Sequence, residues 1–193
     1  MIERDDFVSA TSPGRVAERD VVTPYVEYCV SNIHLGSRPL TVVVDAGNGT
    51  AGPFVVPILE KLGVRVIPLF CEMDATFPNH HPDPTVEENL ADLKNRVLET
   101  RADVGIAFDG DADRIGAVDE RGGVLWGDQL MILFSRSILA AVPGATIVSE
   151  VKCSQTMYDD IRARGGRGIM WKTGHSLIKA KMKEVGALLA GEM

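Results

Sequence analysis

The hydrophobic residues of this chain fall into two kinds of segment, short continuous runs and longer stretches with helical spacing. Continuous apolar runs rich in β-branched residues are typical of strands buried on both faces of a sheet. In the first part of the chain such runs predict strands at 40–44, 64–70, 103–108 and 115–118. Apolar residues at helical spacing predict helices at 23–33, 53–62 and 85–101. This alternation predicts a small α/β sandwich with parallel strands over residues 21–125.

The same alternation resumes near Asp128 and predicts a second α/β unit over residues 128–193. Its predicted helices are 129–142, 154–164 and 176–185, and its predicted strands are 145–151, 168–171 and 187–190. The last strand runs into Gly191-Glu192-Met193 without a closing helix, so we expect the second unit to be incomplete. Residues 1–20 include Pro13-Gly14 and are expected to be a linker or the remnant of a preceding domain. The predicted fold class is α/β, with two consecutive sandwich units and mainly parallel sheets, the second truncated.

One helix start has a local sequence signal. Thr85-Val86-Glu87-Glu88 has the capping-box pattern, in which a Thr hydroxyl and a Glu carboxylate each accept a backbone N–H of the first turn. Three prolines between Phe77 and Pro84 forbid regular structure just before it. We therefore expect an irregular loop at 74–84 and a helix that opens at Thr85.

Composition excludes several classes of protein. The 193 residues are 45% apolar and 24% charged, which is ordinary for a folded globular chain and excludes disorder. A net charge of −7, without a long Lys/Arg run, disfavours binding to nucleic acid or to an anionic membrane. No stretch reaches membrane-spanning length, and the N-terminus lacks a signal-peptide pattern. Cys29, Cys71 and Cys153 are widely spaced and odd in number, so we expect core side chains in a reducing cytoplasm rather than disulfides.

The strongest chemical signal is the segment Asp109-Gly110-Asp111-Ala112-Asp113-Arg114, which follows a predicted strand. Three like charges so close together raise one another's pKa unless they share a cation, so Asp109, Asp111 and Asp113 predict a hard divalent metal. Mg²⁺ is favoured over Ca²⁺ because magnesium is held by a few carboxylates, with other positions left for water and phosphate oxygens. A calcium loop is disfavoured because Arg114 takes the position that needs glycine.

A second motif suggests a different function. Residues 47–52 satisfy the G-x-G-x-x-G pattern of dinucleotide-binding turns and lie between a predicted strand and a predicted helix. The charge of Asp45, at the head of this turn, opposes a bound pyrophosphate. The alternative is a tight strand-to-helix turn that needs positive φ angles, and we favour it over a nicotinamide-binding site.

Histidines form two further candidates. His80 and His81 are adjacent, so their side chains diverge, and a loop or domain-contact role is favoured over metal binding. His175 follows Lys172-Thr173-Gly174 at the junction of a predicted strand and a predicted helix. This position suits a helix cap and a ligand-binding group equally well.

Taken together, these motifs resemble the α-D-phosphohexomutases, specifically the bacterial phosphomannomutase/phosphoglucomutase group. The resemblance runs from about Asp20 through almost the whole chain, with Ala112 where the group more often has glycine. The segments that carry it, besides the aspartate loop, are 45–49, 77–84, 151–153, 171–175 and 191–193. It implies a four-domain enzyme of which this chain covers domain two and most of domain three.

The family resemblance also implies an activity and a cofactor. It implies an isomerase that interconverts hexose 1-phosphate and hexose 6-phosphate, of mannose, glucose or both, through a phosphoserine and a bisphosphorylated intermediate. By position, the three aspartates would bind Mg²⁺ and Arg114 would stabilise phosphoryl charge. Lys152 and His175 would approach the transferring group or the sugar as electrostatic or acid–base partners, and Glu192 would accept hydrogen bonds from sugar hydroxyls.

The resemblance also predicts what the chain lacks. The family's serine loop has the form Thr-Ala-Ser-His-Asn-Pro, and the nearest string, at 9–13, lacks its His and Asn, so Ser12 is not accepted as a nucleophile. The phosphate-anchoring C-terminal domain is missing too. We therefore expect a chain that is inactive alone, with a hexose phosphate and the other domains of the same enzyme as partners. The alternatives are a non-catalytic module that binds Mg²⁺ and a sugar phosphate and, less favoured, an NAD-binding oxidoreductase domain.

Overall fold

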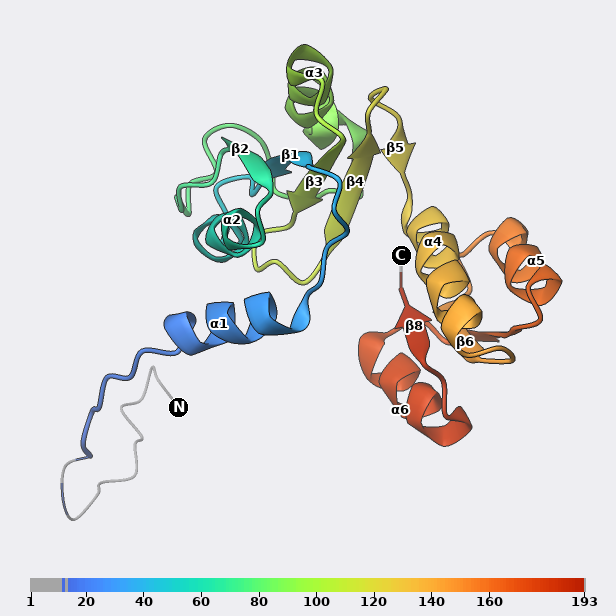
Figure 1. Cartoon of the computed structure of the whole chain (residues 1–193). Helices are drawn as coiled ribbons and strands as arrows, with labels where there is room; N and C mark the ends of the chain where they lie inside the picture. The colour runs from blue at the N-terminus through green and yellow to red at the C-terminus, as the bar shows by residue number, and fades with distance from the viewer. Residues whose placement is uncertain (1–11, 13, 193) are drawn as a thin grey trace.

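Short β-branched segments build the first sheet of the structure, a computed structural model that describes residue 12 and residues 14–192 (Figure 1). The strands lie in the order β2-β1-β3-β4-β5. β1 pairs in parallel with β2 and β3, whereas β4 is antiparallel to β3 and β5 to β4. The strands are β1 (Thr41–Asp45), β2 (Arg65–Leu69), β3 (Val104–Phe108), β4 (Ile115–Asp119) and β5 (Val124–Leu125). The carboxyl ends of β1 and β3 therefore meet at one edge of the sheet.

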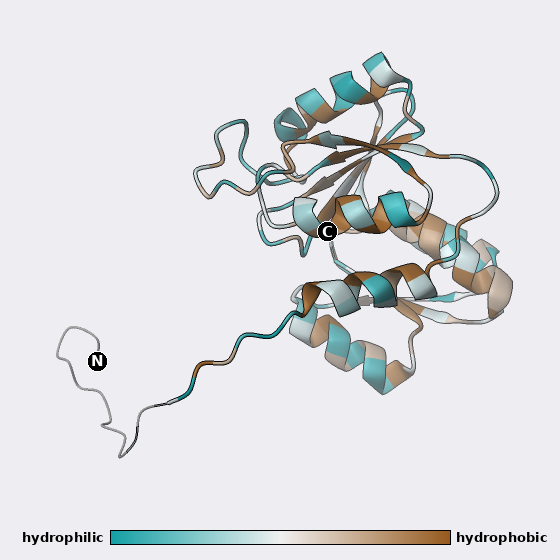
Figure 2. Ribbon diagram, turned by 60° about the vertical axis from the view of Figure 1, so that its left-hand side comes forward, coloured by the Kyte–Doolittle hydropathy of each residue, from teal (hydrophilic) through white to brown (hydrophobic). Residues whose placement is uncertain are grey.

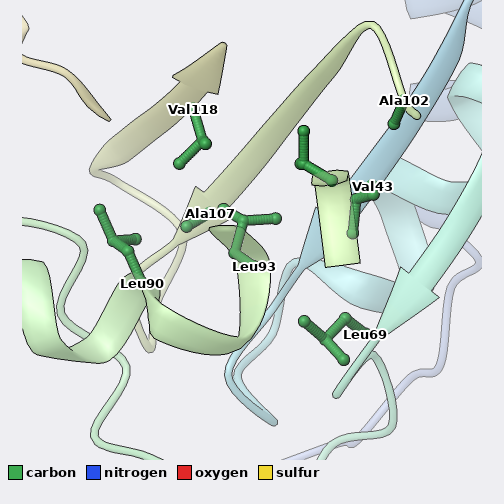
Figure 3. Packing of buried hydrophobic residues seen from close by; sticks show 8 residues of the cluster. Val43, Leu69, Leu90, Leu93, Ala102, Ala107 and Val118 are labelled. Atoms are coloured by element: carbon green, nitrogen blue, oxygen red, sulfur yellow. The ribbon is translucent and has the colours of Figure 1, made fainter. Parts of the chain in front are cut away.

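Helices cover both faces of this sheet because the apolar residues of β1 point alternately to either side. Val43 packs with the apolar face of α3 (Ala91–Thr100) in the cluster drawn in Figure 3, which includes Leu93. Val42 and Val44 instead pack with residues of α2 (Gly52–Lys61) on the opposite face. All three valines of β1 are at most 3% exposed. The first unit is thus a three-layer sandwich, with α1 (Val22–Asn32) packed on α2.

The second unit repeats the plan with three strands, all parallel, in the order β7-β6-β8. Ile147 of the central strand packs with residues of α4 and α5, and Val148 with residues of α6, so helices again cover both faces. Figure 2 shows that the helices carry both hydrophobic and hydrophilic residues. The elements are α4 (Gly127–Ala141), β6 (Thr146–Glu150), α5 (Gln155–Ala163), β7 (Arg167–Trp171), α6 (His175–Val185) and β8 (Leu189–Gly191).

The predicted fold class is confirmed, because four of the six strand pairings are parallel and the chain forms two α/β units. The predicted helices and strands are present, with ends shifted by at most two residues except for the helix predicted at 85–101, which begins at Ala91. The prediction that the first unit has parallel strands holds only for β1, β2 and β3, because β4 and the unpredicted β5 run antiparallel. The three cysteines are free, as expected, but only Cys153 is a buried core side chain, whereas Cys29 and Cys71 are half-buried. In the part of the chain that the structure describes, no helix is long and apolar enough to cross a membrane.

The capping box predicted at Thr85 is wrong. The backbone N–H and the hydroxyl of Thr85 both donate to Asp83 Oδ1, at 3.0 and 2.7 Å. A 3₁₀ turn, η2 (Glu87–Leu90), follows, and α3 begins only at Ala91, without a side-chain cap. The aspartate two residues earlier captures the threonine, because local side-chain hydrogen bonds compete with helix capping.

Candidate active site

The aspartate loop connects β3 to β4 as a tight hairpin. The carboxylates of Asp109, Asp111 and Asp113 each offer an oxygen within 4.8 Å of the others. Asp109 is 2% exposed, whereas Asp111 and Asp113 reach solvent. Ala112 has a φ angle of 63°, a left-handed conformation that glycine adopts at lower cost. This gives a physical reason for glycine at the equivalent position of the family that the chain resembles.

Arg114 neutralises the buried member of this group. Its backbone N–H donates to Asp109 Oδ1 at 2.9 Å, and its Nε donates to Oδ2 at 2.8 Å. Burial disfavours the charged form of Asp109, but the hydrogen bonds and the charge of Arg114 outweigh it, so the pKa of Asp109 lies below its ordinary value. The charges of Asp111 and then Asp109 raise the pKa of Asp113. The outer part of the loop therefore holds negative charge that Arg114 does not fully compensate.

The glycine-rich turn after β1, residues 47–52, packs against the aspartate loop. Thr50 donates its backbone N–H to the carbonyl oxygen of Gly110 at 3.0 Å. A Cβ on Gly49 would lie 2.8 Å from the same oxygen, so only glycine allows the two loops to approach so closely. Gly47 and Asn48 have φ angles of 51° and 61°, which confirms the predicted tight turn with positive φ. Side chains of His80 and Pro82 lie against Gly47, and the backbone of Gly110 lies against Gly49.

The loop at 74–84 lies against the same turn. His80 Nε2 is 3.2 and 3.1 Å from the two carboxylate oxygens of Asp45, and its Nδ1 is 3.0 Å from the carbonyl oxygen of His81. Asp45 is fully buried and also accepts the backbone N–H of Gly47 at 2.8 Å. His80 thus has a loop-anchoring role. Neither His80 nor His81 belongs to the one group of three metal-ligating side chains found among the described residues.

The second unit contributes its candidates at the carboxyl ends of its three strands. Lys152 follows β6, His175 is the first residue of α6 after β7, and Glu192 follows β8. No side chain caps α6, so His175 does not act as its cap. Glu192 Oε1 instead accepts the backbone N–H of Gly174 at 3.0 Å, which ties the end of β8 to the start of α6.

A buried carboxylate, Glu150, connects the loops that follow β6 and β7. It ends β6, is fully buried, and accepts the backbone N–H of Lys152 at 3.0 Å and the hydroxyl of Thr173 at 2.9 Å through Oε2. Its Oε1 is 3.8 Å from the Lys152 ammonium. Glu150 was not predicted from sequence, although a carboxylate at the end of a buried strand is a recognisable signal of a paired buried charge.

One cavity of about 750 Å³ brings the two units together. Asp113 and Arg114 line it from the first unit, and Lys152 and Glu192 line it from the second. Its apolar wall comes from the connection between the units and from α4, including Trp126, Leu130, Met131 and Phe134. Four residues predicted from sequence therefore share one cavity. Asp109, Asp111 and His175 do not line it.

Comparison with known proteins identifies the family. Residues 23–123 match the family model described as phosphoglucomutase/phosphomannomutase, alpha/beta/alpha domain II, and residues 126–193 match that of domain III. The chain is 51% identical over 180 residues to a phosphomannomutase/phosphoglucomutase of Pseudomonas putida, covering 93% of this chain and 39% of the relative. It is 48% identical over 192 residues to that of Pseudomonas aeruginosa, covering 100% of this chain and 41% of the relative.

Solved structures agree with these relatives. A phosphoglucomutase/phosphomannomutase family protein from Burkholderia thailandensis has a TM-score of 0.86 at 48% identity and covers 90% of this chain and 38% of its own. A Thermus thermophilus structure described as a putative phosphomannomutase has a TM-score of 0.80 at 20% identity, covers 90% of this chain and 41% of its own, and supports the fold alone. The fold is thus that of the phosphohexomutases. The chain belongs to the phosphoglucomutase/phosphomannomutase family, with its residues in domains II and III, and spans about 40% of the length of these curated relatives.

The pair between His80 and Asp45 generates a prediction about pH. The hydrogen bond to Asp45 raises the pKa of His80, and the charges of Asp45 and Asp92 add to this effect against the opposing effect of burial. A group whose pKa is higher in the folded state stabilises the protein fully below its unfolded pKa, about 6.5 for histidine. That contribution is lost as pH rises through the folded pKa. We therefore expect the melting temperature of the first unit to fall over this pH window.

Asp45→Asn is the matched variant for this prediction. It should bring the pKa of His80 down toward its ordinary value in an NMR titration of the ring. It should also flatten the pH dependence of melting and lower the stability at pH 6 by about 1.5–3 kcal/mol, since a hydrogen bond to a charged group is lost. An identical His80 titration in both proteins would show that the pair does not control the histidine.

Proposed function

We propose that this chain supplies the metal-binding and part of the sugar-binding machinery of a cytoplasmic phosphohexomutase. The enzyme would interconvert hexose 1-phosphate and hexose 6-phosphate, of mannose, glucose or both, through a phosphoserine and a bisphosphorylated intermediate. The observation that carries this proposal is the shared cavity, where Arg114 and Lys152 supply positive charge beside Glu192, a carboxylate suited to hydroxyl groups. A sugar phosphate carries both of the chemical groups that this combination recognises.

The aspartate loop suits a magnesium ion. Three carboxylates offer oxygens within 4.8 Å of one another, and the raised pKa of Asp113 reflects negative charge that a cation would compensate. Asp109, Asp111 and Asp113 are the proposed ligands. The bound metal would supply neutralisation of charge on phosphoryl oxygens.

Residues of this chain from both units are proposed to stabilise charge and transfer a proton during the reaction. Phosphoryl transfer needs charge stabilised on the moving oxygens and the reactants held in line. Arg114 and Lys152 provide such charge from opposite units. His175 does not line the cavity, but it follows Gly174, whose N–H donates to Glu192 on the cavity wall. It is the proposed group that exchanges a proton with the sugar or the transferring phosphoryl group.

Glu192 is the proposed sugar contact. The hydrogen bond from Gly174 to its Oε1 holds the carboxylate at the cavity wall. A carboxylate fixed in this way can accept hydrogen bonds from sugar hydroxyls without first being ordered by the ligand.

The phosphoserine and the loop that anchors the distal phosphate are proposed to come from other domains of the enzyme. The chain covers 39% and 41% of the two Pseudomonas relatives, so most of each relative lies outside the matched region. The other domains of the same enzyme are therefore its proposed partners, and a hexose phosphate is its proposed ligand.

We expect Mg²⁺ to bind the chain in a calorimetric titration. Asp111→Asn should weaken binding at least about tenfold, because it removes one charged ligand from the group. Glu88→Gln removes the same charge from an exposed position outside the loop and should leave affinity unchanged. Equal Mg²⁺ affinity in the unaltered chain and in Asp111→Asn would refute the metal assignment.

We also expect the purified chain not to convert mannose 1-phosphate to mannose 6-phosphate in the presence of Mg²⁺, because the phosphoryl donor is not among its residues. A coupled assay would measure the conversion, with the full-length Pseudomonas putida relative as the positive control. The Asp111→Asn chain reports any contaminating mutase, which would be equally active in both preparations. Sustained turnover that the substitution abolishes would contradict the proposal.

A further inference from the structure

The proline-rich loop at 77–84 contributes no proposed ligand or catalytic group, yet it packs against the metal-binding region. A Cβ on Gly116, in β4, would lie 2.8 Å from Cβ of Pro84. A Cβ on Gly110 would lie 3.5 Å from Cγ of Pro82 and 3.7 Å from Cζ of Phe77. Pro84 and Thr85 also line the cavity between the two units. The loop therefore lies over the hairpin that carries the aspartates.

The first half of the loop is fixed to the sheet. The imidazole of His80 lies within 3.2 Å of both oxygens of Asp45, and the Asn79 amide donates to Asn48 Oδ1 at 2.7 Å. The side chain of His80 is 14% exposed and that of Asp45 is fully buried, so solvent screens this contact little. A Cβ on Gly47 would lie 2.9 Å from Cβ of Pro82, which shows how closely the loop follows the turn below it.

The second half of the loop presents Asp83 to Arg114. An Nη of Arg114 donates to Asp83 Oδ1 at 3.1 Å, while its Nε donates to Asp109 at 2.8 Å. Two carboxylates from different loops thus hold two different nitrogens of one guanidinium. Asp83 is also held independently of the arginine, because its Oδ1 accepts hydrogen bonds from the backbone N–H and the hydroxyl of Thr85.

Two-point contact matters because the Arg114 side chain is 50% exposed. An exposed arginine samples many rotamers, and an isolated surface ion pair restrains it weakly. Contact at Nε alone leaves the guanidinium able to rotate about its Nε–Cζ bond. Contact at Nη with a carboxylate that is 22% exposed and already anchored opposes this rotation.

We propose that Asp83 is a positioning residue for Arg114, and that the anchor formed by His80 and Asp45 fixes Asp83 in place. The loop at 77–84 then holds the guanidinium of Arg114 in one orientation at the cavity. This inference rests on the proposed function, which gives Arg114 its role in stabilising phosphoryl charge. A group held in position before the substrate arrives stabilises transferring charge without reorganisation.

The direct test measures guanidinium rotation in this chain by NMR, as exchange between the two Nη nitrogens of Arg114. Asp83→Ala should accelerate this exchange several-fold, and Asp83→Asn should accelerate it less, because its amide oxygen still accepts hydrogen bonds. His80→Gln should also accelerate it by releasing the loop. Arg136, held by Asp160 at 2.6 Å in the second unit, is the internal control and should not change. Unchanged Arg114 exchange in both Asp83 variants, with Arg136 also unchanged, would overturn the inference.

An activity measurement separates this inference from the proposed function. In a chimera where residues 22–192 replace the matching segment of the Pseudomonas aeruginosa relative, Asp83→Asn should lower kcat roughly tenfold, with KM for the hexose phosphate changed less. Faster Arg114 rotation with unchanged kcat would contradict the role proposed for Arg114 and leave its positioning by Asp83 intact. The opposite outcome is a large loss of kcat in Arg114→Ala while the Asp83 variants show neither faster rotation of Arg114 nor reduced kcat. It would refute the positioning role of Asp83 and leave the role proposed for Arg114 intact.

Discussion

The hydrogen-bonded pair between Asp109 and Arg114 is the interaction on which the metal-binding region depends. Asp109 is 2% exposed, and a carboxylate so buried is costly unless it is paired. The backbone and side chain of Arg114 satisfy both of its oxygens, which closes the hairpin within a few residues. Asp111 and Asp113 remain toward solvent. The arginine that compensates the buried charge is also the one that reaches the cavity.

In both units, a buried carboxylate at the end of the first strand fixes neighbouring loops. β1 and β6 have the same burial pattern, and each ends in a fully buried carboxylate, Asp45 or Glu150. Asp45 fixes a neighbouring loop through His80. Glu150 fixes one through Thr173 and accepts the backbone N–H of Lys152. A buried charge has few acceptable arrangements, so it specifies loop positions that apolar packing alone would leave open.

Sequence reasoning succeeded where a short stretch of chain carries the whole signal. The β-branched run of β1 predicts a strand buried on both faces, and the aspartates on alternate residues predict a cluster. Three contacts could not be predicted from sequence, because the partners lie far apart along the chain. The separation is 35 residues for His80 and Asp45, 31 for Asp83 and Arg114, and 23 for Glu150 and Thr173. The failure of the capping box at Thr85 has a different origin, since two local interactions competed and the pattern does not state which is stronger. The roles of Lys152 and His175 came from the family resemblance.

The central claim is that the aspartate loop binds a divalent cation beside a fixed Arg114. The most direct measurement replaces Mg²⁺ with paramagnetic Mn²⁺ and records the broadening of backbone amide signals by NMR. If the loop binds the cation, the strongest broadening will be at 110–114 and at Thr50, whose N–H donates to Gly110. Excess Mg²⁺ should reverse it, and Asp111→Asn should abolish it. Broadening centred elsewhere, or equal broadening of the loop in Asp111→Asn, would contradict this claim.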